Sequence, residues 1–501
     1  YRYPYWSAMA NTWINKKGIM IFTSLSFALF FLIVAILYYV LPGKFRWLWL
    51  LLSGLFFYMY SNPAYILVPL FIILITWNAG LKIEQAATPK KARQFYLLAI
   101  IANIGVLVFF KYTNFFTSTA FEFLNFSRQK ILHSGEPLHN SLLINVIAPL
   151  GISYITFQAI GYLIEIKRGN HTAEKHLGHF STFLLFFPKI VAGPVERAHN
   201  FLPQLKQTKV CSYDNVSMGL KLILWGLFKK LVIAERLSIY VSTVFGSAAH
   251  HSGISIMIAV IFYALQTYAD FSGYTDMALG FAKVLGFDLT QNFNRPLLAK
   301  SITEFWRKWH ISLSTWFADY FYTPIAIAKR DWGNLGVIYA FFVTFIVLGF
   351  WHGANWTFII FGALQGLMLS VEFLTRKARK SFRKKLPVFL NNILGIGFTF
   401  FYFAFSLIFF RADSVTDALT IIKRIFSRGP LFLENPTIML FSLAGIFFLV
   451  LVELKKEYFN GLFSLASNKN FLVRVCYYCL LLVIILAAGV FDGGEFIYFQ
   501  F

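Results

Sequence analysis

Two histidines in apolar surroundings are the first candidates for chemistry in this sequence. His352 ends a strongly apolar stretch in VLGFWHGANWTFIIFG, where a titratable side chain is costly and indicates a functional site. His310 lies in EFWRKWHISLSTWFADY, which is too charged for a lipid-facing span and too aromatic for a free loop. That pattern predicts an amphipathic or re-entrant helix. Because imidazole titrates near neutral pH, the pair suits general acid or base catalysis on a hydroxyl acceptor, and a structural role is the alternative.

Neighbouring polar and aromatic side chains should support the two histidines. Asn355 follows His352 by three residues, so it either shares a helical face with the histidine and hydrogen-bonds it or substrate, or it caps a helix. Ser312 lies two residues beyond His310 and so on a different side of a helix, which argues against a serine nucleophile. The expected supporting or tunnel-lining set is Trp306, Arg307, Trp309, Ser312, Trp351 and Asn355, together with Asp270, Asp276 and Lys189.

Two carboxylates also fall within an apolar stretch, YADFSGYTDMALG. Asp270 and Asp276 are six residues apart and not on one helical face, and Gly273 is expected to break the helix between them. We expect them to cap helices or to pair with basic residues such as Arg295 or Arg307, close to the site, rather than to form a catalytic dyad.

A broken apolar run, FSTFLLFFPKIVAGP over residues 180–194, is too short for an ordinary span and contains Pro188, Gly193 and Pro194. It predicts a re-entrant segment, whose free backbone groups must lie within protein or line a cavity. Lys189 in this run either binds a phosphate of a donor molecule or extends its amino group to the membrane interface.

Metal, disulfide and nucleotide chemistry have little support. The HTAEKHLGH stretch, residues 171–179, has histidines one turn apart but no ligands that complete a tetrahedral set, so we expect no metal. Cys211, Cys476 and Cys479 are too few for a disulfide framework. Cys476 and Cys479 lie in an apolar stretch and are expected to be buried and inert, whereas Cys211 is expected in a polar cytoplasmic loop. The sequence has no P-loop and no dinucleotide motif, so the energy must come with an activated donor.

The elements that position these residues are membrane spans. The chain is 58% hydrophobic and only 13% charged, which excludes a soluble domain. Its net charge of +23 lies in short clusters between apolar runs, as the positive-inside rule predicts, and not on a basic face that would bind nucleic acid. We predict an all-α bundle of about 11 to 12 transmembrane helices with re-entrant segments. The expected spans are residues 21–41, 46–61, 64–81, 95–111, 143–163, 218–235, 254–279, 336–351, 356–374, 391–410, 437–453 and 471–490.

Residues 20–501 should form a single membrane domain, preceded by a lead-in over residues 1–19. The basic stretches 82–93 and 376–385 should be cytoplasmic, and the threading from them places residues 282–334 inside as well. His352 then lies at the far end of the next span, so the two histidines can meet only partway through the bilayer. Such a meeting point requires a central tunnel filled by water or substrate.

The sequence contains the motifs FWRKWHISLSTWFADYFYTPI, GFWHGANWTFIIFGALQG, YADFSGYTDMALG and FFPKIVAGPVER, and the closing FIYFQF. Together they resemble the membrane-bound O-acyltransferase family. Within it, they most resemble the bacterial alginate-acetylation branch. The resemblance runs from about residue 20 to the end of the sequence. It implies His352 as the catalytic histidine and His310 as the second active-site histidine. Ala318 stands where the family commonly has arginine.

The resemblance further implies a multi-pass protein of the bacterial inner membrane that serves exopolysaccharide modification, such as alginate biosynthesis. The donor would be a cytoplasmic acyl thioester such as acetyl-CoA, with no tightly bound cofactor. The acyl group, expected to be acetyl, would move to hydroxyls of an extracytoplasmic polysaccharide, directly or through an esterase-like acyltransferase partner. The alternatives are D-alanyl transfer from a carrier protein and a transporter or scaffold of an exopolysaccharide machine.

Overall fold

The computed structural model describes residues 20–60, 62–130, 148–191, 193–433, 435–459 and 470–491. The expected lead-in, the start of the expected span 143–163 and the closing FIYFQF lie outside these ranges. Every regular element within the described ranges is a helix. The all-α prediction is therefore confirmed.

Within the described ranges, eight helices are long and apolar enough to cross a membrane, which confirms a multi-pass membrane protein. Their residues are mostly apolar over the whole circumference, since lipid and neighbouring helices are both apolar surroundings. They are α4 (Leu67–Glu84), α5 (Pro89–Lys130), α12 (Gly253–Val284), α16 (Asn334–His352), α17 (Trp356–Leu374), α19 (Val388–Arg411), α21 (Pro436–Tyr458) and α22 (Phe471–Ala488).

The remaining four expected spans are also helical, but shorter or interrupted. Three are α2 (Leu25–Val40), α3 (Arg46–Met59) and α6 (Ile152–Lys167). The fourth, expected over residues 218–235, is part of a longer element: α10 (Tyr213–Leu227) continues through a π-helix, η3 (Phe228–Ala234), into α11 (Glu235–Gly246). Polar residues within this element hid its length from hydropathy, and the charged Lys229, Lys230 and Glu235 at its middle are buried.

The chain divides into two compact units, here called unit 1 (residues 1–213 and 285–289) and unit 2 (residues 214–284 and 290–501). In unit 1 the expected re-entrant segment is broken as predicted, with α7 (Leu177–Leu185) and α8 (Phe187–Ile190) separated by extended Phe186. Its side chains are buried, so the free backbone groups at the break lie within protein. The other short elements of unit 1 are η1 (Gly43–Phe45), η2 (Pro63–Ile66) and α9 (Ala198–Lys206).

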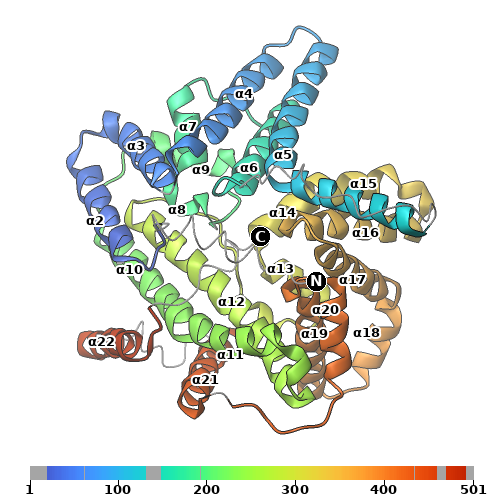
Figure 1. The fold of residues 1–501 in the computed structure, drawn as a ribbon. Coiled ribbons are helices and arrows are strands. Elements are labelled where there is room, and N and C mark those ends of the chain that lie inside the picture. Colours follow the sequence, from blue (N-terminus) through green and yellow to red (C-terminus); the bar gives the residue numbers. More distant parts are fainter. Residues whose placement is uncertain are drawn as a thin grey trace. The chain divides into compact units, whose positions relative to one another are not determined.

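Unit 2 is built around α12, which packs against η3, α11 and α19 (Figure 1). Gly273 does not break this helix, contrary to expectation. It is glycine because a Cβ there would lie 2.8 Å from the carbonyl oxygen of Gly226, so the missing side chain lets two backbones approach closely. The other elements of unit 2 are η4 (Ala248–His250), η5 (Pro296–Leu298), α13 (Ile302–Lys308), α14 (Ile311–Phe317), η6 (Ala318–Tyr322), α15 (Thr323–Ala328), η7 (Arg330–Trp332), α18 (Arg376–Lys384) and α20 (Val415–Arg424).

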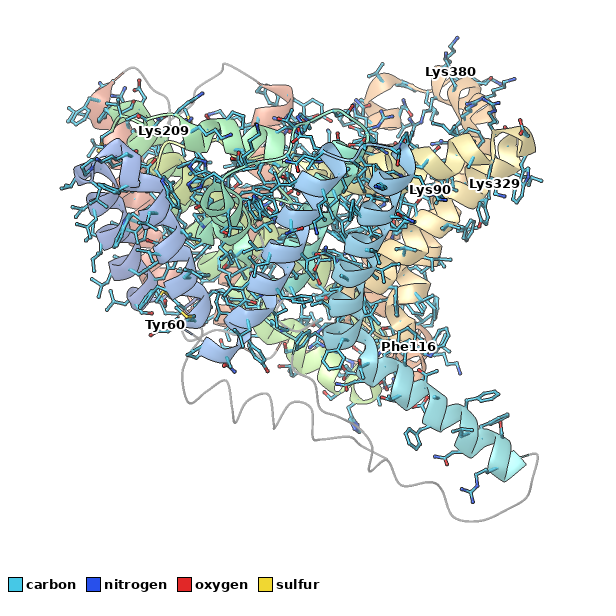
Figure 2. The ribbon with its side chains drawn as sticks, turned by 90° about the horizontal axis from the view of Figure 1, so that it is seen from above. Tyr60, Lys90, Phe116, Lys209, Lys329 and Lys380 are labelled. Carbon is cyan, nitrogen blue, oxygen red and sulfur yellow. The ribbon has the colours of Figure 1, made fainter. Side chains whose placement is uncertain are left out.

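The basic loops group by side within each unit. In unit 1, Lys90 and Lys209 point to one edge in Figure 2, and Tyr60 lies at the opposite edge. In unit 2, Lys329 and Lys380 both lie toward one edge. This grouping fits the threading predicted from the positive-inside rule. For each unit, the assignment of its basic side to the cytoplasm stays a prediction.

Candidate active site

His310 lies at a break between two short helices of unit 2 rather than inside one. It is the N-cap of α14, and α13 ends two residues before it. Its φ is 43°, in the left-handed region that non-glycine residues rarely adopt. The expected helix is therefore interrupted at the histidine itself. Backbone strain of this kind persists only where surrounding structure enforces it, and it occurs preferentially at functional sites.

Asn292 holds the backbone just after His310. Its carbonyl oxygen accepts a hydrogen bond from Ile311 N at 2.9 Å. Its side-chain Oδ1 accepts from Ser312 N at 3.2 Å and from Ser312 Oγ at 2.6 Å. Asn292 is fully buried, so these bonds are shielded from water. Ser312 thus supports the break, and its hydroxyl already donates to Asn292.

His352 is the last residue of α16 and is buried among aromatic rings. The centroid of its imidazole lies 4.8 Å from the ring of Trp351, 5.2 Å from that of Phe410 and 6.3 Å from that of Phe361. Gly353 leaves the helix in an extended conformation. The histidine is therefore held at a helix end by packing from α17 and α19.

The two histidines meet at one indole. The Trp351 ring lies 6.4 Å from the imidazole of His310 and 4.8 Å from that of His352. Phe271 of α12 covers His310 from another direction, with ring centroids 4.7 Å apart. The structure thus brings together the two motifs that sequence analysis singled out, which are 42 residues apart in the chain.

A narrow pocket in unit 2 opens onto His352. Trp306 and Trp309 of the predicted supporting set line it. The other wall residues are apolar or nearly so and gave no signal in the sequence, because they look like any other residue of a membrane span. They are Thr267, Phe361, Phe403, Leu407 and Phe410.

Gln365 is a supporting residue that sequence analysis missed. Its Oε1 accepts a hydrogen bond from Trp306 Nε1 at 3.2 Å, and its Nε2 donates to Ser406 Oγ at 2.8 Å. It thereby fixes one wall of the pocket to α17 and α19. A buried amide in an apolar span was the available signal, because such a group needs partners. Arg307, in contrast, is exposed.

Asp270 and Asp276 form ion pairs, but not with the residues expected. Lys230 Nζ lies 2.7 Å from Asp270 and 2.5 Å from Glu235, and Lys229 Nζ lies 2.6 Å from Asp276. Both lysines belong to η3, whose wider turn directs two consecutive side chains toward α12. The cluster fixes α12 next to Phe271, the residue that covers His310.

The expected arginine partners are thus wrong. Arg295 pairs with Glu457 at 2.7 Å, and Arg307 is exposed. The lysines were missed because their position depends on a π-helix, which hydropathy does not reveal. For Asn355, the capping alternative is correct: its Oδ1 accepts from Thr357 N at 3.1 Å at the start of α17.

Lys189 lies inside unit 1. Its amino group donates to Gln158 Oε1 and lies over the rings of Phe183 and Phe201, at 3.9 and 4.9 Å from their centroids. Burial, partly opposed by Glu196, lowers the pKa of Lys189 to about 7. Because the side chain is fully buried, it does not reach the membrane interface.

Burial also decides the charge of His310. With the side chain 1% exposed, burial lowers its pKa to about 3. The imidazole is therefore neutral near pH 7 and has one N–H donor and one acceptor nitrogen. Among the residues that the structure describes, no group of three or more His, Cys, Asp or Glu side chains lies where it could hold a metal ion.

Comparison with known proteins shows the family to which a chain with these two histidine motifs belongs. The family model of the membrane-bound O-acyltransferases matches residues 90–411, a range that contains both histidine motifs. The chain belongs to the membrane-bound O-acyltransferase family. It is therefore an O-acyltransferase, and the resemblance seen in the motifs is confirmed.

Individual relatives share most of the chain. Peptidoglycan O-acetyltransferase of Helicobacter pylori is 33% identical over 442 residues, covering 82% of this chain and 80% of its own. The probable alginate O-acetylase AlgI of Pseudomonas aeruginosa is 33% identical over 417 residues, covering 82% and 75%. Teichoic acid D-alanyltransferase of Bacillus subtilis is 29% identical over 277 residues, covering 53% and 69%.

Proposed function

We propose that this O-acyltransferase moves an acetyl group from a cytoplasmic acyl thioester, such as acetyl-CoA, to hydroxyls of an extracytoplasmic polysaccharide. The transfer is direct or passes through a hydroxyl of an extracytoplasmic, esterase-like partner protein. The protein would work in the bacterial inner membrane. The convergence of His310 and His352 on Trp351, beside a pocket walled by apolar and aromatic side chains, carries the proposal.

In the proposed step His352 acts as general base. It takes the proton of the acceptor hydroxyl as that oxygen attacks the thioester carbonyl. The oxyanion that forms accepts a hydrogen bond from the N–H of a neutral His310 or from another donor nearby. When the C–S bond breaks, the departing thiolate recovers the proton from His352. Most of the side chains that wall the pocket are apolar or aromatic, and surroundings of low polarity strengthen each of these polar contacts.

The surroundings of the histidines favour direct transfer over an acyl-enzyme. Ser312 Oγ is engaged with Asn292. The three cysteines are exposed, which corrects the expectation of burial for Cys476 and Cys479, and none of the three lines the pocket. Within the described part of the chain, no serine or cysteine is therefore placed as a nucleophile beside either histidine.

The proposal is tested with the purified His352→Ala protein, supplied with a labelled acetyl thioester and with a cell-envelope fraction that contains the acceptor polysaccharide. We expect the chemical step to fall by at least ~10²-fold, the usual contribution of a positioned acid or base, with donor binding little changed. The melting temperature should stay close to that of the parent protein. Normal transfer by a folded His352→Ala protein would refute the catalytic role.

Similarity to the teichoic acid D-alanyltransferase supports a second candidate, D-alanyl transfer from a carrier protein. The acyl group separates the two. Label delivered from acetyl thioester, and not from a D-alanyl carrier, supports the first proposal. The converse result would replace it with the second.

A further inference from the structure

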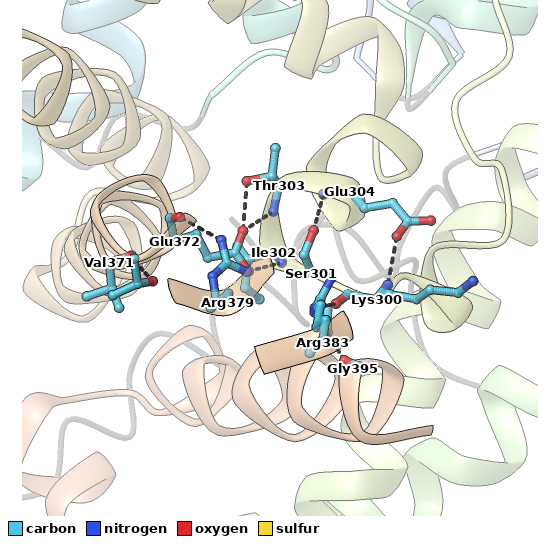
Figure 3. Close-up of polar contacts among 12 residues, drawn as sticks. Lys300, Ser301, Ile302, Thr303, Glu304, Val371, Glu372, Arg379, Arg383 and Gly395 are labelled. Atoms are coloured by element: carbon cyan, nitrogen blue, oxygen red, sulfur yellow. Dashed lines mark hydrogen bonds and ion pairs between the residues drawn. The ribbon is translucent and has the colours of Figure 1, made fainter. Parts of the chain in front are cut away.

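The start of α13, the helix that leads to His310, is held by a carboxylate from another helix. Glu372 near the end of α17 accepts hydrogen bonds from Ile302 N at 2.9 Å and Thr303 N at 3.0 Å. Its Oε2 also accepts from Thr303 Oγ1 at 2.7 Å. Figure 3 shows these bonds converging on one carboxylate. They satisfy backbone donors that a helix cannot satisfy by itself at its first turn.

Glu372 is only 3% exposed, and a buried carboxylate is costly unless it is paired and hydrogen-bonded. Arg379 of the basic helix α18 provides the charge, with Nη1 3.5 Å from Glu372 Oε1 and Nη2 donating to the Glu372 backbone carbonyl at 2.6 Å. Arg383 of the same helix donates to the carbonyl of Lys300, just before α13. Glu372 thus lies between α13 and α18 and contacts both.

The same face of α17 holds α13 at a second point. Gln365, seven residues or about two turns before Glu372, accepts from Trp306 in the middle of α13. At its other end α17 begins four residues after His352. A single helix therefore follows directly from one histidine and holds the helix that leads to the other.

We propose that Glu372 is a positioning residue for acyl transfer. By fixing the first turn of α13 against α17, it sets the place of the strained backbone at His310 relative to His352. The inference rests on the proposed function, in which His310 and His352 act on the same acyl group. This role requires a carboxylate, because a side chain with two acceptor oxygens is needed to accept hydrogen bonds from Ile302 N, Thr303 N and the Thr303 hydroxyl.

The test compares Glu372→Gln with Glu372→Asp in the purified acyl transfer assay. Gln keeps the size but replaces one acceptor oxygen by an NH₂ donor. We expect Glu372→Gln to lower kcat about tenfold or more, as a misplacement of about 1 Å can cost up to 10², while KM for the donor changes little. Asp retains charge and both acceptors one methylene shorter, and should recover part of kcat.

A double-mutant cycle tests whether Glu372 affects the rate of acyl transfer through His310. If Glu372 acts through His310, Glu372→Gln should cost little further rate in a His310→Gln background, measured by single turnover. Glu174→Gln is the matched control, because Glu174 is also buried and pairs with Lys206 at 2.6 Å, but in unit 1. We expect it to leave kcat unchanged.

Three outcomes would overturn the inference: unchanged kcat in Glu372→Gln, an equal loss in both backgrounds, or loss of folded protein in both the Gln and Asp variants. His352→Ala in the same assay keeps the two proposals apart. If it is active, the proposed function fails. If it is inactive while Glu372→Gln is fully active, only the role of Glu372 fails.

Discussion

The indole of Trp351 and the imidazole of His310 lie 6.4 Å apart at their ring centroids, although α16 carries one and the break between α13 and α14 carries the other. Trp351 also precedes His352, whose ring lies 4.8 Å away. One aromatic side chain thus lies against both histidines, and we expect it to maintain their separation.

Replacing Trp351 should disturb that separation. Trp351→Ala removes the ring that both imidazoles contact, so we expect kcat to fall by roughly 10²-fold, because small misplacements of catalytic groups are costly. Trp351→Phe keeps an aromatic surface and should lose less. Steady-state kinetics of both folded variants measure the effect, and equal rates in Ala and Phe would contradict this role.

The neutral state of His310 should appear in the pH dependence of stability. Burial lowers its pKa to about 3, below the value of about 6.5 in an unfolded chain. Below pH 6.5 the unfolded state binds a proton that the folded state does not, so stability falls as pH decreases from 6.5 toward 3. His310→Asn should show a shallower decline in melting temperature over this range. An identical decline in both proteins would mean that His310 is not held neutral.

The contact between α10 and α12 should not tolerate a side chain. A Cβ at Gly226 would lie 2.5 Å from the Gly273 carbonyl oxygen, which is backbone and cannot turn away. We expect Gly226→Ala to destabilise the protein by about 1 to 3 kcal/mol, as overpacking does, with a lower melting temperature in detergent. Gly105→Ala is the control, because its Cβ would meet nothing within 4 Å. Equal stability of the two variants would argue against close packing at Gly226.

The side of the membrane that α18 faces can be measured directly. Seven of the residues 376–385 are Lys or Arg, and they follow directly on α17, so we expect them in the cytoplasm. A cysteine placed at the exposed Lys380, in a chain without its own three cysteines, should react with an impermeant maleimide only after the cells are opened. Labelling of intact cells would reverse the topology.

Direct transfer predicts that no acyl group stays on the enzyme. Purified protein mixed with labelled acetyl thioester and no acceptor should contain no stable acyl adduct when it is analysed by intact mass. A stable adduct on a side chain of the protein that is then passed to acceptor would replace the direct mechanism with a two-step one.

The sequence alone determined the class of the protein and singled out two histidines as the candidates for its chemistry. Long apolar runs allow few folds other than a bundle of membrane helices, because lipid cannot satisfy backbone groups. A histidine at the end of an apolar span is conspicuous for the same reason, and so is the buried run around Lys189. These inferences depend on the cost of polar groups in apolar surroundings, which composition and order reveal directly.

Only the tertiary structure decided which partners these groups have. Asp270 and Asp276 pair with Lys230 and Lys229 because a π-helix turns two consecutive lysines toward α12, and no local pattern marks such a turn. Glu372 holds α13 across 70 residues of sequence. Pairings of this kind depend on how helices pack, and helix packing is determined by contacts between segments far apart in the chain.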